Sequence, residues 1–125
     1  MKVKVTPSKV HGNVKIPASK SMAHRALICA SLSDGTSIVS NVTNSKDIEA
    51  TVGRMKALGA KIKQIDETTY EVTGTNLFKQ EGNITCNANE SGSTLRFLIP
   101  LAACTNAKVK FLGQGRLLQR PMDVY

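Results

Sequence analysis

Three residues near the start of the chain have the types and the spacing of an anion-binding site. Lys20 and Ser21 open a stretch with apolar residues at helical spacing, and Arg25 follows Ser21 by four residues. Residues four apart lie on one side of a helix, and its first turn carries unpaired N–H groups and the positive end of the helix dipole. A lysine and an arginine there would bind phosphate or carboxylate groups. A solvated first turn with a serine cap is the alternative that these residues alone leave open.

A second anion signal lies in the segment 90–94, where small residues precede another helical pattern. Gly92 would let a ligand approach the backbone N–H groups closely, although a plain helix cap is the commoner reason for such a turn. A loop over 113–122, expected to be flexible, follows. Its Arg120 precedes Pro121, which favours an extended backbone and a side chain that points into a cleft; a solvated surface arginine is the alternative.

The elements that must position these residues follow from hydrophobic periodicity and turn signals. In chain order we expect a strand over 10–16, a helix over 20–32 whose buried face includes Ala26, a strand over 36–42, a helix from the Ser45 cap to Gly59, a hairpin over 61–73, a strand over 83–86, a helix from Ser91 and a strand over 108–112. Arg25 and Arg96 occupy equivalent places about seventy residues apart, which indicates a weak internal repeat.

Composition narrows the classes of partner. The net charge of +8 favours acidic partners, but aromatic residues make up only 4% of the 125 residues and are scattered, so base stacking is not indicated. Small anionic substrates fit better than nucleic acid, and a basic nucleic-acid-binding module stays an alternative supported by the charge alone. A hydrophobic fraction of 41% is enough for a core of one domain, or for a piece of a larger one.

Cysteine usage and the first residues predict a cytoplasmic protein. Cys29, Cys86 and Cys104 are odd in number and lack metal-ligand spacing, which argues against a disulfide framework or a zinc site and favours buried, reduced thiols. The first residues lack the apolar core of a signal peptide. The longest apolar run, 97–104, is too short to cross a membrane, so no membrane partner is expected.

Four collinear motifs together resemble the 5-enolpyruvylshikimate-3-phosphate synthase family. They are PASKSMAHRAL (17–27), SKDIEAT (45–51), ESGSTLRF (90–97) and QRPM (119–122). The resemblance implies an α/β (α+β) fold of repeated β-α-β-α-β-β units, with one complete unit at about 10–74 and most of a second, truncated, at about 83–125. The chain would then be a partial amino-terminal domain, because family members are several-fold longer and close two domains on their substrates.

The resemblance also implies an activity and roles for particular residues. The family transfers the carboxyvinyl group of phosphoenolpyruvate to the 5-hydroxyl of shikimate 3-phosphate and releases phosphate. Lys20, Ser21 and Arg25 would bind shikimate 3-phosphate, whereas Lys20, Gly92 and Arg120 would bind phosphoenolpyruvate. Lys20 would act electrostatically, no metal or cofactor is required, and the main acid–base residues lie in the carboxy-terminal part that this chain lacks. We therefore expect this chain to be inactive without that part.

Two positions depart from the family pattern. Ala18 stands where many relatives have glycine, and Glu90 stands where many have asparagine, so an unpaired carboxylate would repel the anionic substrate. We expect Asp47 to stabilise the first turn of its helix, paired with Arg96, and not to act as an acid or base. The related transferase acting on UDP-N-acetylglucosamine is the alternative within the same fold; it has Lys-Asn where this chain has Lys20-Ser21, and a loop cysteine that 113–120 lacks.

Overall fold

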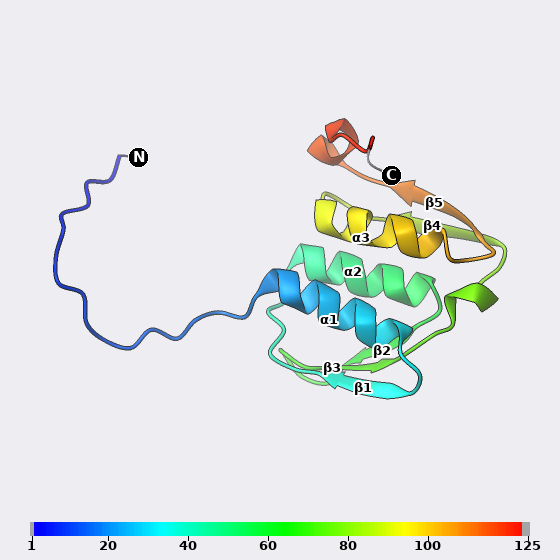
Figure 1. Ribbon diagram of the computed structural model, residues 1–125, viewed down its shortest axis with the longest axis horizontal. Coiled ribbons are helices and arrows are strands. Elements are labelled where there is room, and N and C mark those ends of the chain that lie inside the picture. Colours follow the sequence, from blue (N-terminus) through cyan, green and yellow to red (C-terminus); the bar gives the residue numbers. More distant parts are fainter. Residues whose placement is uncertain (1, 124–125) are drawn as a thin grey trace.

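Three α-helices lie side by side in one layer in the computed structural model, which describes residues 2–123 (Figure 1). The elements, in chain order, are α1 (Lys20–Leu32), β1 (Thr36–Val39), α2 (Lys46–Ala57), β2 (Lys61–Gln64), β3 (Tyr70–Thr73), the 3-10 helix η1 (Leu77–Lys79), β4 (Asn83–Asn87), α3 (Gly92–Ala102), β5 (Lys108–Leu112) and the 3-10 helix η2 (Gly115–Gln119). An antiparallel sheet ordered β1-β3-β2 covers α1 and α2, and the parallel pair β4-β5 flanks α3.

Each α-helix begins at a serine cap. The hydroxyl oxygens of Ser19, Ser45 and Ser91 accept hydrogen bonds from the backbone N–H three residues on, which satisfies one of the unpaired donors of each first turn. The predicted starts of all three helices are thereby confirmed, although Ala26, expected on the buried face of α1, is exposed. The first turns of the three helices lie at the same end of the layer (Figure 1), so three positive dipole ends point the same way.

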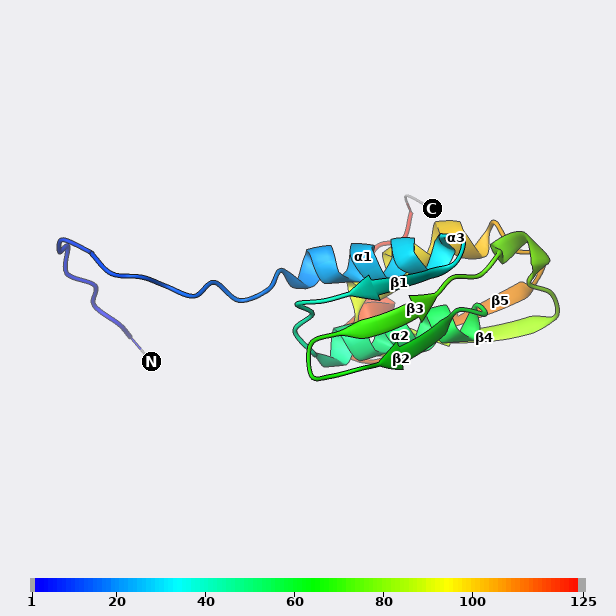
Figure 2. The same cartoon turned by 90° about the horizontal axis from the view of Figure 1, so that it is seen from below.

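The hydrophobic core lies between the helix layer and the three-stranded sheet (Figure 2). The predicted hairpin is confirmed: β2 pairs antiparallel with the central strand β3, which pairs on its other side with β1. Tyr70 and Val72 alternate along β3 and are both buried, whereas Glu71 between them is exposed. They pack with Leu27 of α1 and with Ile48 and Met55 of α2, all fully buried.

The second part of the chain forms a strand, helix and parallel strand. β4 and β5 pair in parallel with α3 as their crossover, and β4 also packs against α2. Pro100 lies inside α3, as expected, and the helix continues to Ala102. The result places the first turn of α3 beside the first turns of α1 and α2.

The predicted strand over 10–16 is absent. Residues 2–19 form neither helix nor strand and extend away from the helix layer (Figure 1). Val10, Val14 and Ile16 are each more than four-fifths exposed. The alternating pattern is present in the sequence, but a strand requires a neighbour for its N–H and C=O groups, and no strand described within residues 2–123 pairs with it.

Three further expectations need correction. The strand expected over 36–42 ends at Val39, because the chain turns at Asn41, whose φ is 58°. The loop over 113–122 is not irregular throughout: it contains η2, which buries the side chain of Leu117. Of the three cysteines only Cys86 is buried. No helix within residues 2–123 is long and apolar enough to span a membrane.

Candidate functional site

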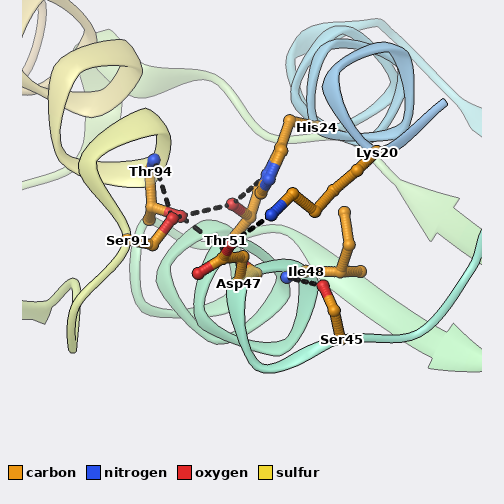
Figure 3. Close-up of polar contacts among 8 residues, drawn as sticks. All are labelled: Lys20, His24, Ser45, Asp47, Ile48, Thr51, Ser91 and Thr94. Carbon is orange, nitrogen blue, oxygen red and sulfur yellow. Dashed lines mark hydrogen bonds and ion pairs between the residues drawn. The ribbon is translucent and has the colours of Figure 1, made fainter. Parts of the chain in front are cut away.

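An ion pair joins the first turns of α1 and α2. Lys20 Nζ lies 2.6 Å from Asp47 Oδ2 (Figure 3), and this contact is the main reason that the pKa of Asp47 is lowered from its usual value. Asp47 lies in the first turn of α2, as predicted, where a carboxylate stabilises the helix dipole. The expected pairing of Asp47 with Arg96 is wrong, because Lys20 projects from the neighbouring helix directly onto the carboxylate.

Arg25 lies one turn further along α1 and is held by two contacts. Its Nη1 donates a hydrogen bond to the backbone carbonyl of Ser21 at 2.9 Å, and its guanidinium lies 4.9 Å from the centre of the Phe97 ring of α3. The ring face attracts the cation and fixes the direction of an otherwise mobile side chain. Ser21 and Arg25 are both exposed, so the predicted pair lies on one accessible face of α1.

Gly92 and Arg120 are brought together although they lie 28 positions apart in the sequence. A Cβ on Gly92 would overlap Nη1 of Arg120, so the guanidinium rests on the backbone at the start of α3. Arg120 has an extended backbone, with φ −78° and ψ 137°, as its place before Pro121 predicts. This pair therefore combines backbone N–H groups with a cation at one helix start.

A buried chain of side-chain hydrogen bonds connects the three helices beneath these groups (Figure 3). His24 Nδ1 lies 2.8 Å from Thr51 Oγ1, which lies 2.8 Å from Thr94 Oγ1, which in turn lies 2.8 Å from Ser91 Oγ. All four residues are at most 4% exposed. Thr94 Oγ1 also lies 3.4 Å from the backbone carbonyl of Asp47, so the chain reaches the residue that pairs with Lys20.

This hydrogen-bond chain is not among the predictions from the sequence, although the sequence contains a signal for it. Thr51 falls three residues after Ile48 and four before Met55, on the buried stripe of α2. His24 adjoins Ala23 and precedes Leu27 by three residues on the buried face of α1. A polar residue on such a stripe is expected to find a buried partner. Which partner it finds depends on how the helices pack, and the sequence pattern does not give that.

Burial lowers the pKa of His24 from its usual value of 6.5. The Asp47 carboxylate opposes that shift, whereas the positive charges of Lys20 and Arg25 add to it. A neutral imidazole is therefore favoured inside the folded protein.

Glu90 is exposed at the edge of the site. Its carboxylate lies against Gly115 at the start of η2, and no cation lies within ion-pairing distance of it among residues 2–123. It lines an open hollow of about 450 Å³, which is bounded by Lys46, Asp47, Glu49, Asn89, Glu90 and Gln114. Glu90 thus places an additional negative charge beside the first turns of α2 and α3.

The predicted site residues come together at one end of the helix layer. Lys20 is linked through Asp47 to the start of α3, Arg25 is linked through Phe97 to the same helix, and Arg120 rests on Gly92. Three cations and three helix starts suit two or more anionic groups held close together. Within residues 2–123 no three His, Cys, Asp or Glu side chains are grouped as metal ligands.

Comparisons with known proteins identify the family of this chain. The sequence profile of EPSP synthase (3-phosphoshikimate 1-carboxyvinyltransferase) matches residues 4–125. The 3-phosphoshikimate 1-carboxyvinyltransferase of Clostridium perfringens strain SM101 is 52% identical over 124 residues, which are 99% of this chain and 29% of that protein. The enzyme of the same name from Clostridioides difficile is 46% identical over 134 residues, covering 98% of this chain and 30% of its own length.

The fold agrees as well. The structure of EPSP synthase from Acinetobacter baumannii superposes on 90% of this chain with a TM-score of 0.78 at 20% identity, and 26% of that structure is covered. The chain thus spans less than a third of the length of the relatives that it matches, and it is a mixed α/β structure that corresponds to part of their fold. On the match of the sequence profile over residues 4–125, the chain belongs to the EPSP synthase (3-phosphoshikimate 1-carboxyvinyltransferase) family.

Proposed function

We propose that this chain supplies one half of an active site that transfers the carboxyvinyl group of phosphoenolpyruvate to the 5-hydroxyl of shikimate 3-phosphate. The observation that carries the proposal is that Lys20, Arg25 and Arg120 lie within the first two turns of three helices that begin at the same end of their layer. The names of the matching relatives supply the reaction. We place the activity in the cytoplasm, in aromatic amino-acid biosynthesis, as the sequence leads us to expect.

The chemistry requires this kind of field. Both substrates are anionic, so bringing the hydroxyl to the vinyl carbon requires fixed positive groups that offset their mutual repulsion. We assign shikimate 3-phosphate to Lys20, Ser21 and Arg25. Phosphoenolpyruvate would lie between Lys20 and the Gly92–Arg120 pair, so that one lysine serves both anions.

The acid–base steps need groups that the site does not offer in suitable form. The reaction adds a proton to the vinyl carbon, removes one from the hydroxyl, and expels phosphate. Asp47 is engaged with Lys20, and its lowered pKa makes it a poor proton donor. The catalytic acid and base would therefore come from the rest of the full-length protein, and we expect this chain alone to release no phosphate from the two substrates.

The finer assignment of the fold belongs to the same proposal. We assign residues of about 10–74 to one β-α-β-α-β-β unit and about 83–125 to most of a second. The equivalent starts of α1 and α3, each with a serine cap and an arginine in the second turn, support the repeat. Because 10–16 is not a strand here, the first strand of that unit would form only against a partner strand outside the described residues.

A chimeric enzyme tests the function directly. The 125-residue chain is joined to the remainder of the Clostridium perfringens relative, and phosphate release is measured with phosphoenolpyruvate and shikimate 3-phosphate. We expect activity from the chimera and none from the chain alone. Lys20→Ala should lower kcat/KM at least about a hundredfold, because it removes a charged contact to both substrates. The matched control Lys63→Ala removes an exposed lysine of β2 and should change kcat/KM less than twofold.

The same assay decides against the alternative acceptor. UDP-N-acetylglucosamine replaces shikimate 3-phosphate in a parallel reaction. Phosphate release with that acceptor, and none with shikimate 3-phosphate, would reassign the function. A folded chimera that is inactive with both acceptors would contradict the proposal.

A further inference from the structure

The hydrogen-bond chain under the site has a direction, because each hydroxyl group has a single proton to donate. Thr94 can donate its proton to Ser91 Oγ at 2.8 Å, to the backbone carbonyl of Asp47 at 3.4 Å, or to Thr51 Oγ1 at 2.8 Å, where either hydroxyl can be the donor. In the first two cases the proton points to the first turn of a helix and away from Thr51. The Thr94 oxygen is then free to accept at the 2.8 Å contact with Thr51.

The direction carries back to the imidazole of His24. Thr51 then donates to Thr94, so its own oxygen is the acceptor at the 2.8 Å contact with His24 Nδ1. Nδ1 therefore carries the proton of the neutral ring. Nε2, which is buried and has no partner within residues 2–123, is left with a lone pair. The opposite tautomer would bury an N–H group without an acceptor, which folded proteins rarely tolerate.

We propose that His24 is a positioning residue, which as the Nδ1–H tautomer starts a one-way hydrogen-bond chain through Thr51 and Thr94 and so fixes the first turns of α1, α2 and α3 relative to one another. The role in substrate binding rests on the proposed function. His24 does not touch the exposed face of the site; it acts through the positions of Lys20 and Gly92. This hydrogen-bond chain determines whether Lys20 and Gly92 face the same substrates.

The geometry explains why buried polar groups stand where apolar ones would pack. Each of the three helices contributes to the hydrogen-bond chain, and the contributing residues lie at the helix caps or within the first two turns (Figure 3). Apolar contacts would hold these helices together but allow small sliding movements, whereas hydrogen bonds fix register. A shift of about 1 Å at a site for two anions is enough to lower catalysis strongly.

Protonation of His24 would oppose this role. It would place a second proton on the unpartnered Nε2 and a positive charge beside Lys20 and Arg25 of α1. Within residues 2–123 the charge that offsets it is that of Asp47 of α2. α3 contributes hydroxyl groups to this cluster. Mild acid should therefore weaken the arrangement before it affects Asp47.

The tautomer can be observed without any substrate. The chain has two histidines, His11 and His24, and His11 is exposed in the extended segment, so spectra of the 15N-histidine-labelled chain are assigned with His11→Gln. At pH 7.5 a long-range 1H–15N correlation should show His24 with a protonated Nδ1 and an unprotonated Nε2. In Thr51→Val, which removes the acceptor at nearly constant volume, His24 should lose the single-tautomer pattern.

The positioning role is tested in the chimeric enzyme. Thr51→Val should raise the KM for shikimate 3-phosphate about tenfold, the size of one buried hydrogen bond. Thr51→Ser restores the hydroxyl and should restore the KM. His24→Asn keeps an N–H donor near the place of Nδ1 and should stay within about threefold of the parent, whereas His24→Leu should behave like Thr51→Val.

The NMR and KM results test the tautomer of His24, its positioning role and the proposed function separately. A protonated Nε2 on His24 would overturn the directed chain, whatever the activity. An unchanged KM in folded Thr51→Val and His24→Leu chimeras would overturn the positioning role. An inactive parent chimera would contradict the proposed function alone, because the NMR measurement would still decide the tautomer. If Thr51→Val fails to fold, the KM values of Thr51→Ser and His24→Asn decide: parent-like values are required.

Discussion

The two ends of the helix layer are built from different kinds of contact. At the end where the helices begin, Gly92 faces the guanidinium of Arg120, a group at the end of a flexible side chain. At the end where they finish, Gly74 lies against the backbone carbonyl of Ser33, just beyond α1. Both glycines leave room for a neighbouring group. The group beside Gly92 is a side chain, whereas the group beside Gly74 is part of the main chain.

The difference separates binding from folding. Backbone hydrogen bonds fix the end where the helices finish. Thr75 N donates to the Ser31 carbonyl at 2.8 Å, and Gly74 N donates to the Gly35 carbonyl at 3.0 Å. At the end where the helices begin, the exposed groups are charged side chains and not main-chain atoms. A site for anions collects charges that repel one another, and the rest of the fold must offset that cost. Matched substitutions at the two ends should therefore have different consequences.

The largest effect on stability is expected for Gly74→Ala. A Cβ at this position would overlap the Ser33 carbonyl oxygen and crowd that of Ala30, and neither can move without displacing the end of α1. We expect a loss of about 3 kcal/mol or more in the free energy of unfolding, measured by urea denaturation.

Gly53→Ala is the matched control for this loss. Gly53 lies inside α2, and a Cβ there would meet nothing within 4 Å. Alanine favours the helix over glycine by about 0.5–1 kcal/mol, so this variant should be slightly more stable than the parent. Equal stabilities for Gly74→Ala and Gly53→Ala would show that the described contact with Ser33 does not exist.

Gly92→Ala should impair substrate binding and leave the stability of the fold nearly unchanged. The new methyl group displaces the Arg120 guanidinium, which can move into solvent, so unfolding should change by less than about 1 kcal/mol. In the chimera we expect the KM for phosphoenolpyruvate to rise at least about tenfold, because the methyl group also occupies the approach to the backbone N–H groups. An unchanged KM would remove Gly92 and Arg120 from the proposed phosphoenolpyruvate site.

A smaller effect, confined to the end where the helices begin, is expected from pH. The pKa of His24 is lowered by folding, so below its unfolded value of 6.5 the unfolded chain binds more protons than the folded one. Stability should therefore fall as the pH is lowered from 7.5 to 5.5, with a slope of at most about 1.4 kcal/mol per pH unit. Urea denaturation across this range should show the slope in the parent and not in His24→Asn.

The sequence predicts the helices of this fold better than the site beneath them. Serine caps and hydrophobic spacing give all three helix starts, because these signals are local. The strand over 10–16 is wrong, because a local pattern does not supply a pairing partner. The expected Asp47–Arg96 pair is wrong, because sequence spacing does not show which side chains of neighbouring helices meet. The His24–Thr51–Thr94 chain requires the packing of three helices, and no single periodic pattern contains that information.

The smallest effect is expected from the Lys20–Asp47 pair. The folded chain lowers the pKa of Asp47, so the pair stabilises the protein above the unfolded value of 3.8 and this contribution is lost as the pH falls through the lower, folded value. The side chains of Lys20 and Asp47 are 54% and 34% exposed, so solvent screening limits the contribution to a few tenths of a kcal/mol. Because the pKa of Asp66 is also lowered, by hydrogen bonds from Thr68 and Thr69, the parent must be compared with Lys20→Met by urea denaturation at pH 5 and pH 3. The loss between these pH values should be slightly smaller in Lys20→Met, and added salt should narrow the difference. A difference of more than about 1 kcal/mol would mean that the pair is shielded from solvent, and this end of the layer would then be as rigid as the other.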